Sequence, residues 1–92
     1  MIVKLNLEGS LDLPDNQTKY RRACKHIESA FAGVRDKSSD QPTWHIADEG
    51  KGDLFEHARR VCRELNTLLD GVGKAYAYIG ADRVSGEIEA TS

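Results

Sequence analysis

Two stretches of the chain read almost alike: YRRACKHIESAF, from Tyr20 to Phe31, and ARRVCRELNTLL, from Ala58 to Leu69. Each contains two consecutive arginines, a small apolar residue, a cysteine and a further cation, in the same order. Apolar residues recur in both stretches at intervals of three and four, the spacing that places them on one face of an α-helix. The two stretches therefore predict two amphipathic helices with matching faces.

Local signals predict where these helices begin and end. The first is expected over about 16–32, with Gly33 as its stop. The second is expected to start at Asp53, which together with Glu56 has the spacing of a capping box, and to close at Gly71.

The segments outside the helices read as short strands. Met1–Leu7 alternates apolar and polar residues, which indicates a half-buried strand, and Leu11–Leu13 is expected to return as a second short strand. Thr43–Asp48 alternates more weakly. Lys74–Gly80 and Ser85–Thr91 are predicted to form an antiparallel hairpin connected through the residues ADRV.

Length and composition indicate one folded unit. The 92 residues are 39% hydrophobic and 30% charged, the balance of a soluble globular domain. We therefore expect a single α+β domain over residues 1–92, a small antiparallel β-sheet packed against two amphipathic α-helices on one face. The start, MIVKLNLEGS, lacks the pattern of a secretory signal, and no segment approaches the roughly 18 apolar residues of a membrane span, so we expect an intracellular protein with no membrane partner.

The outer faces of both predicted helices are basic, although the formal net charge is −2. On a helical wheel the cations of the two stretches occupy the same angles, opposite the apolar residues. These cations are the candidate residues for binding a partner or nucleic acid: Arg21, Arg22, Lys25, Arg59, Arg60 and Arg63.

An ordinary solvated helix surface is the alternative interpretation of this charge. The spacing offers three intrahelical ion pairs, Lys25–Glu28, Glu56–Arg60 and Arg60–Glu64, and leaves the other cations without a partner four residues away. Five of the six cations are arginines, whose planar fork suits carboxylate and phosphate recognition. The pattern therefore favours a surface for an acidic protein or a nucleic acid.

The aromatic residues leave two readings open. Tyr76 and Tyr78 share one side of a predicted strand, where rings beside cations can stack on single-stranded bases. Either this side or the side with Ala75 and Ala77 packs under the helices. Trp44 is either a core anchor or an interface anchor.

No catalytic or metal-binding pattern is recognisable. Cys24 and Cys62 lie on apolar helix faces and read as core thiols. The three histidines, His26, His45 and His57, have neither a nucleophile motif nor metal-ligand spacing. We expect a protein that is not an enzyme and that has no catalytic residue, metal or cofactor.

As a whole, the chain resembles the phage-encoded anti-CRISPR proteins that inhibit the type I-F crRNA-guided surveillance complex, the Csy or Cascade complex. The resemblance runs over the full length, including MIVKLNLEG, KYRRACKHIESAF and HARRVCRELNTLLDG. It implies a protein of the host bacterial cytoplasm that evades host defence by binding Cas protein subunits, with the crRNA as a further partner, and so blocks target DNA binding or hybridisation. No site residue transfers from the family, so the six cations are assigned to these contacts from charge pattern alone.

Two other classes of protein remain open. One is a small phage or bacterial nucleic-acid-binding regulatory protein without catalytic activity, although the predicted helices are too far apart in sequence for a helix-turn-helix. The other is a small enzyme or metal protein that uses Cys24 or Cys62.

Overall fold

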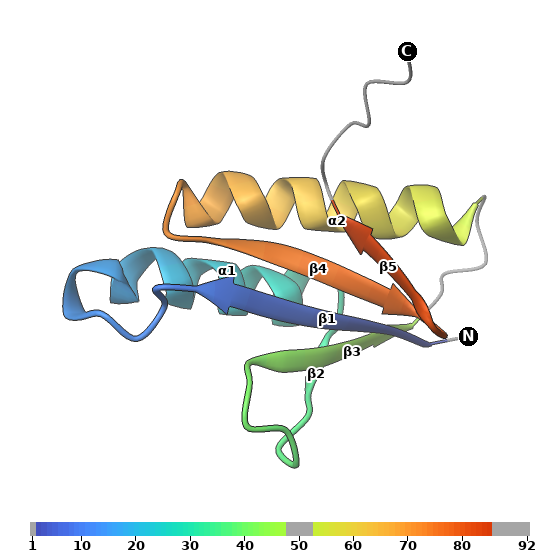
Figure 1. Ribbon diagram of the computed structural model, residues 1–92, viewed down its shortest axis with the longest axis horizontal. Coiled ribbons are helices and arrows are strands. Elements are labelled where there is room, and N and C mark those ends of the chain that lie inside the picture. The colour runs from blue at the N-terminus through green and yellow to red at the C-terminus, as the bar shows by residue number, and fades with distance from the viewer. Residues whose placement is uncertain (1, 48–52, 86–92) are drawn as a thin grey trace.

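The computed structural model describes residues 2–47 and 53–85 (Figure 1). The elements, in chain order, are β1 (Ile2–Gly9), the 3-10 turn η1 (Pro14–Asn16), α1 (Gln17–Ala30), β2 (Val34–Arg35), β3 (Thr43–Ala47), α2 (Leu54–Leu69), β4 (Gly73–Ile79) and β5 (Asp82–Ser85). The predicted α+β fold, an antiparallel sheet with two helices, is confirmed.

The five strands pair antiparallel in the order β2-β3-β1-β4-β5. The central strand β1 sets the register, because Leu5 lies opposite Trp44 of β3 and opposite Ala77 of β4. Helix α1 connects β1 to β2 and α2 connects β3 to β4, each passing over one intervening strand. This is the split β-α-β unit used twice, the arrangement of ferredoxin-like folds. The two helices run antiparallel (Figure 1).

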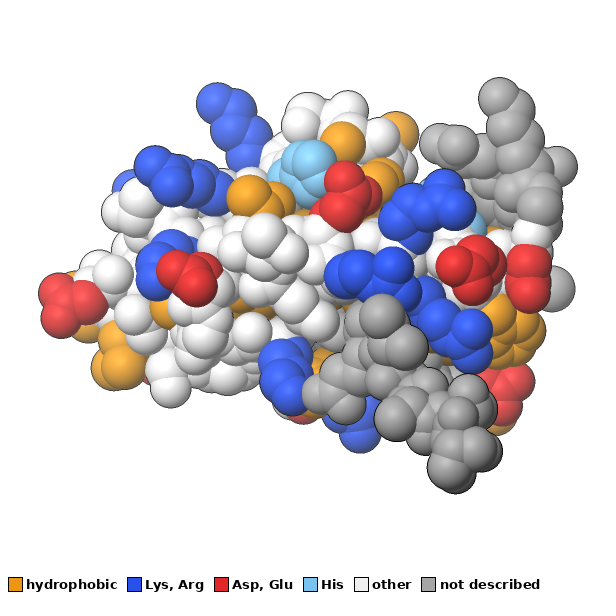
Figure 2. All heavy atoms as spheres, turned by 90° about the horizontal axis from the view of Figure 1, so that it is seen from above, with side chains coloured by type: hydrophobic (Ala, Val, Ile, Leu, Met, Phe, Trp, Pro, Cys, Tyr) orange, Lys and Arg blue, Asp and Glu red, His pale blue; other side chains and the backbone are white. Residues whose placement is uncertain are grey.

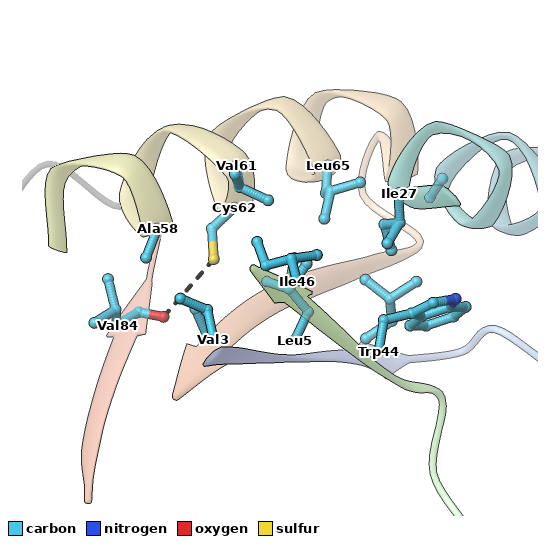
Figure 3. Close-up of a cluster of buried hydrophobic side chains, with 14 of the residues drawn as sticks. Val3, Leu5, Ile27, Trp44, Ile46, Ala58, Val61, Cys62, Leu65 and Val84 are labelled. Carbon is cyan, nitrogen blue, oxygen red and sulfur yellow. Dashed lines mark hydrogen bonds between the residues drawn. The ribbon is translucent and has the colours of Figure 1, made fainter. Parts of the chain in front are cut away.

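The core lies between the helices and one face of the sheet. Alternation along β1 buries Val3, Leu5 and Leu7 on this face. From the helices, Ile27 and Leu65 are fully buried against the same face, as Figure 3 shows. Hydrophobic burial on this one face therefore sets which side of every strand faces solvent.

This packing decides whether Trp44 belongs to the core and which side of the strand with Tyr76 and Tyr78 faces the helices. Trp44 is 1% exposed and belongs to the core, with its Nε1 donating to Oε2 of Glu28 at 3.4 Å. In β4, Ala75 and Ala77 are buried beneath the helices, and Tyr76 and Tyr78 lie half-buried on the opposite face. We refer to that opposite side as the open sheet face.

Helix ends follow the predicted signals in part. At the start of α2, Oδ1 of Asp53 accepts a hydrogen bond from the backbone N–H of Phe55 at 2.9 Å, as an N-cap does. Helix α1 ends at Ala30, earlier than expected. The residue after the helix that adopts the left-handed conformation is Ala32, with φ 51°, and not the expected Gly33. The N–H of Gly33 donates to the carbonyl oxygen of Ile27 at 2.9 Å.

Two strand predictions were wrong. Leu11–Leu13 forms no strand, because Leu11 is buried in the turn that follows β1 and Pro14 begins η1. The residues Asp82–Val84, expected to connect two strands, belong to β5 itself, and the turn lies at Gly80 and Ala81. Most of the strand expected over 85–91, and the turn expected at 49–52, lie outside the described residues.

Candidate binding surface

The six predicted cations are all exposed on the side of the helices that faces away from the sheet. Burial of Ala23 and Ile27 in α1, and of Val61 and Leu65 in α2, turns the arginine positions outward. We name the residues from α1 the α1 cluster and those from α2 the α2 cluster. Their members are Arg21, Arg22 and Lys25, and Arg59, Arg60 and Arg63, respectively.

The antiparallel helices place these clusters toward opposite ends of the helical layer. Near the start of α1, Nζ of Lys19 lies 3.1 Å from Oδ2 of Asp70, which follows the end of α2. In the middle, Nε2 of His26 lies 3.9 Å from Oε1 of Glu64. Leu68 lines a shallow hollow beside these two side chains. The view from the α2 side shows the basic side chains in separate groups with a histidine and an acid between them (Figure 2).

Most of these cations have no acidic partner within the described part of the chain. Among the described residues, no carboxylate oxygen lies within 4.0 Å of any of the six except at Arg59, whose Nη1 is 3.8 Å from Oε2 of Glu56. The three ion pairs expected from spacing are not formed. Glu28 accepts from Trp44, Glu56 pairs with Arg59 instead of Arg60, and Glu64 faces His26.

The open sheet face is a second polar surface, and its composition depends on strand register. Across the strands, His45 lies opposite Lys4, Lys4 opposite Tyr78, and Tyr78 opposite Arg83. Sequence reasoning placed the tyrosines together but missed Lys4 and Arg83 as their neighbours. The alternation of β1 does put Lys4 away from the core, but nothing in the sequence gives its cross-strand partners.

The thiols do not form a reactive site. Cys62 is buried, its Sγ lies 3.8 Å from the carbonyl oxygen of Val84, and burial raises the pKa of the thiol to about 12. Cys24 is half-buried, and burial is also the main cause that raises its pKa. A reactive cysteine needs a lowered pKa, so both thiols have the opposite environment.

His45 lies beside an acid, Asp36. Nε2 of His45 lies 3.2 Å from Oδ2 of Asp36. Oδ1 of Asp36 accepts from the hydroxyl of Ser38 at 2.6 Å and from its backbone N–H at 3.0 Å. The Ser38 hydroxyl, followed by His45, lowers the pKa of Asp36 to about 2. Over 2–47 and 53–85, no three His, Cys, Asp or Glu side chains are grouped in a way that suits a metal ion.

A cavity of about 470 Å³ opens beside the end of β1, away from both clusters. Apolar side chains line it together with two acids, Glu8 and Asp12, and it contains none of the six cations. It has no nucleophile paired with a base, so it does not suggest an active site.

Neither helix of the described part of the chain is long and apolar enough to cross a bilayer. No protein-family model, no curated protein and no solved structure matches this chain. The chemistry of the exposed surfaces is therefore the guide to what the protein binds.

Proposed function

We propose that the protein is an inhibitor that binds the type I-F crRNA-guided surveillance complex and prevents it from binding target DNA. The observation that carries this proposal is the set of exposed arginines on the two helices that lack an acidic partner among the described residues. Such a complex offers guide RNA phosphates and acidic protein side chains, both of which guanidinium groups recognise. The protein itself would perform no chemistry and would act by occlusion.

Rigidity of the scaffold supports this role. The arginines project from two helices that are held by a shared core, in which Ile27 and Leu65 are 0% exposed. Side chains on packed helices keep their spacing, which lowers the entropic cost of docking against a fixed partner. Because the helices run antiparallel (Figure 1) and His26 lies beside Glu64, the two clusters extend from this pair toward opposite ends of the helical layer, and a partner that contacts both must span it.

To test this proposal, the purified protein is mixed with the purified surveillance complex. Size-exclusion chromatography shows whether the two co-elute, and a gel mobility shift assay measures target DNA binding. Two variants reverse one cluster each: Arg21→Glu/Arg22→Glu/Lys25→Glu and Arg59→Glu/Arg60→Glu/Arg63→Glu. Reversed charge against an acidic partner adds repulsion to the lost attraction, so each variant is expected to inhibit on the order of tenfold less well or worse.

The matched control is Lys37→Glu, which reverses an exposed cation in the turn after β2, outside both helices and the open sheet face, and is compared with the single variants Arg22→Glu and Arg60→Glu of the same charge change. It should inhibit as the wild type does. Failure of the wild type to co-elute would remove the proposal. Inhibition by both helix variants at the wild-type level would show that the clusters are an ordinary solvated surface.

The competing function is a nucleic-acid-binding regulatory protein. A duplex DNA arm of the same experiment separates the two, because a regulator would bind duplex DNA without the surveillance complex and would lose affinity steeply with added salt. Retention of the protein on duplex alone, with no effect on the complex, would favour the regulator.

A further inference from the structure

We propose that the open sheet face is a second binding surface, and that it binds single-stranded RNA by stacking bases on Tyr76 and Tyr78. This inference does not depend on the proposed function, because it uses the side of the molecule opposite to the two clusters.

The register brings the relevant side chains into two adjacent rows. The first row crosses four strands and contains His45, Lys4, Tyr78 and Arg83. In the second row, Tyr76 has Asn6 on one side and Ser85 on the other. The helices lie on the opposite face, so no described element covers these rows (Figure 1).

The two rings are suited to successive bases. Tyr76 and Tyr78 are two residues apart on one strand, roughly 6.6 Å along its axis, and both are half-buried with part of each side chain accessible. The guanidinium Cζ of Arg83 lies 3.8 Å from the centroid of the Tyr76 ring. A guanidinium at this distance covers one face of the Tyr76 ring, and a base stacks there on the outer side of the guanidinium plane, since bases stack on guanidinium planes as well as on aromatic rings.

The charge of this face suits a phosphate backbone. Among the residues that the structure describes, Lys4, Lys74 and Arg83 point to it together with Glu8, whose Oε2 lies 3.9 Å from Nη2 of Arg83. The described part of this face therefore carries more cations than acids, in a chain whose formal net charge is −2. His45 lies at the border of this face, with its Nε2 3.2 Å from Oδ2 of Asp36.

Single-stranded RNA fits these groups better than a duplex does. Bases reach a flat aromatic platform only when they are unstacked from one another, and an open antiparallel sheet is a common platform for splayed RNA bases. Asn6 and Ser85 flank Tyr76 with an amide and a hydroxyl, groups that can hydrogen-bond a ribose 2′-hydroxyl, which distinguishes RNA from DNA.

The experiment measures fluorescence anisotropy of a labelled single-stranded oligouridine at about 50 mM salt and again at higher salt. The variants are Tyr76→Leu and Tyr78→Leu, which keep apolar packing on the sheet but remove the ring, and Tyr78→Phe, which keeps the ring. Each leucine variant should lower affinity roughly tenfold, and the phenylalanine variant should stay close to the wild type. Lys4→Gln should reduce the slope of log K against log salt by about 0.7, as loss of one phosphate contact does on a single strand.

Far-UV circular dichroism and thermal unfolding check that each variant is folded, and Lys4→Gln keeps the test independent of both tyrosines. Lys37→Gln makes the same chemical change as Lys4→Gln at an exposed cation in the turn after β2, outside both surfaces, and should bind the oligouridine like the wild type. Absence of binding by the wild type, equal binding by the folded leucine variants, or tighter binding of the matching oligodeoxythymidine would each overturn the proposal. These outcomes are independent of co-elution with the surveillance complex.

Discussion

Nε2 of His26 lies 3.9 Å from Oε1 of Glu64, and these two residues occupy the same place in the two matching stretches of the sequence. The helices run antiparallel (Figure 1), so matched positions away from this pair lie further apart along the helices. The repeated sequence therefore places one cluster toward each end of the helical layer, with His26 and Glu64 between them.

The first prediction concerns the matched arginines Arg22 and Arg60. Both are exposed and have no ion pair among the described residues, so Arg22→Glu and Arg60→Glu should each leave the free energy of unfolding within about 0.5 kcal/mol of the wild type. Urea denaturation measures this. Losses well above 1 kcal/mol would mean that the clusters stabilise the fold instead of serving as a binding surface.

A second prediction compares two identical truncations. Leu65 is 0% exposed in the core, whereas Leu13 is 51% exposed ahead of η1. Leu65→Ala should destabilise the protein by about 2–5 kcal/mol because it leaves a cavity, and Leu13→Ala should change stability by no more than about 0.5 kcal/mol. Urea midpoints give both values. Similar losses at both sites would contradict the packing of α2 on the sheet.

A third prediction tests the N-cap of α2. Oδ1 of Asp53 satisfies the N–H of Phe55, so Asp53→Ala should destabilise the protein by about 1 kcal/mol. Asp12 is exposed in the turn after β1, and Asp12→Ala makes the same chemical change there with an expected effect below about 0.5 kcal/mol. The comparison fails if thermal unfolding shifts equally in the two variants.

The buried thiol leads to a fourth prediction, in alkaline solution. In the fold the pKa of Cys62 is raised from its ordinary value of 9.0 to about 12, so the unfolded chain releases this proton first. The stabilising effect is fully present below about pH 9 and is lost as the pH rises toward about 12. Stability should therefore fall more steeply with pH in the wild type than in Cys62→Ala.

Thiol labelling provides an independent check on Cys62. In a Cys24→Ala background, a disulfide reagent at pH 8 should leave Cys62 unmodified in the native protein and modify it fully in urea, because the native thiol is buried and protonated. Rapid labelling of the native protein would show that the thiol is accessible.

A fifth prediction concerns stability in acid, which Asp36 should make dependent on pH in the opposite direction to Cys62. The pKa of Asp36 is lowered from 3.8 to about 2 by the Ser38 hydroxyl and by His45, so the unfolded chain takes up this proton first as the pH falls. The stability that Asp36 contributes is present above about pH 4 and is lost as the pH falls toward 2. Asp36→Asn and Ser38→Ala should both weaken this dependence, and parallel curves for Asp36→Asn and the wild type would refute it.

The parts of the structure that depend on periodicity can be predicted from the amino-acid sequence. The spacing of apolar residues around Ile27 and Leu65 defines both helices, and the alternation through Leu5 defines the central strand, because hydrophobic burial selects the side that faces inward. The same periodicity places Arg22 and Arg60 on outward faces. Local signals were weaker, since the expected strand at Leu11–Leu13 is a turn in which Leu11 packs into the core and Leu13 is exposed.

Which side chains come together depends on how the helices pack and the strands pair, and could not be predicted from the sequence. Spacing within the helix suggested Arg60 as a partner of Glu64, yet the packing of the helices brings Glu64 to His26. Strand order and register place Lys4 beside Tyr78 on the open sheet face, across residues that are distant in the chain. Such contacts arise from how the elements cross and pair, and a pattern of a few neighbouring residues carries no information about the partner strand or helix.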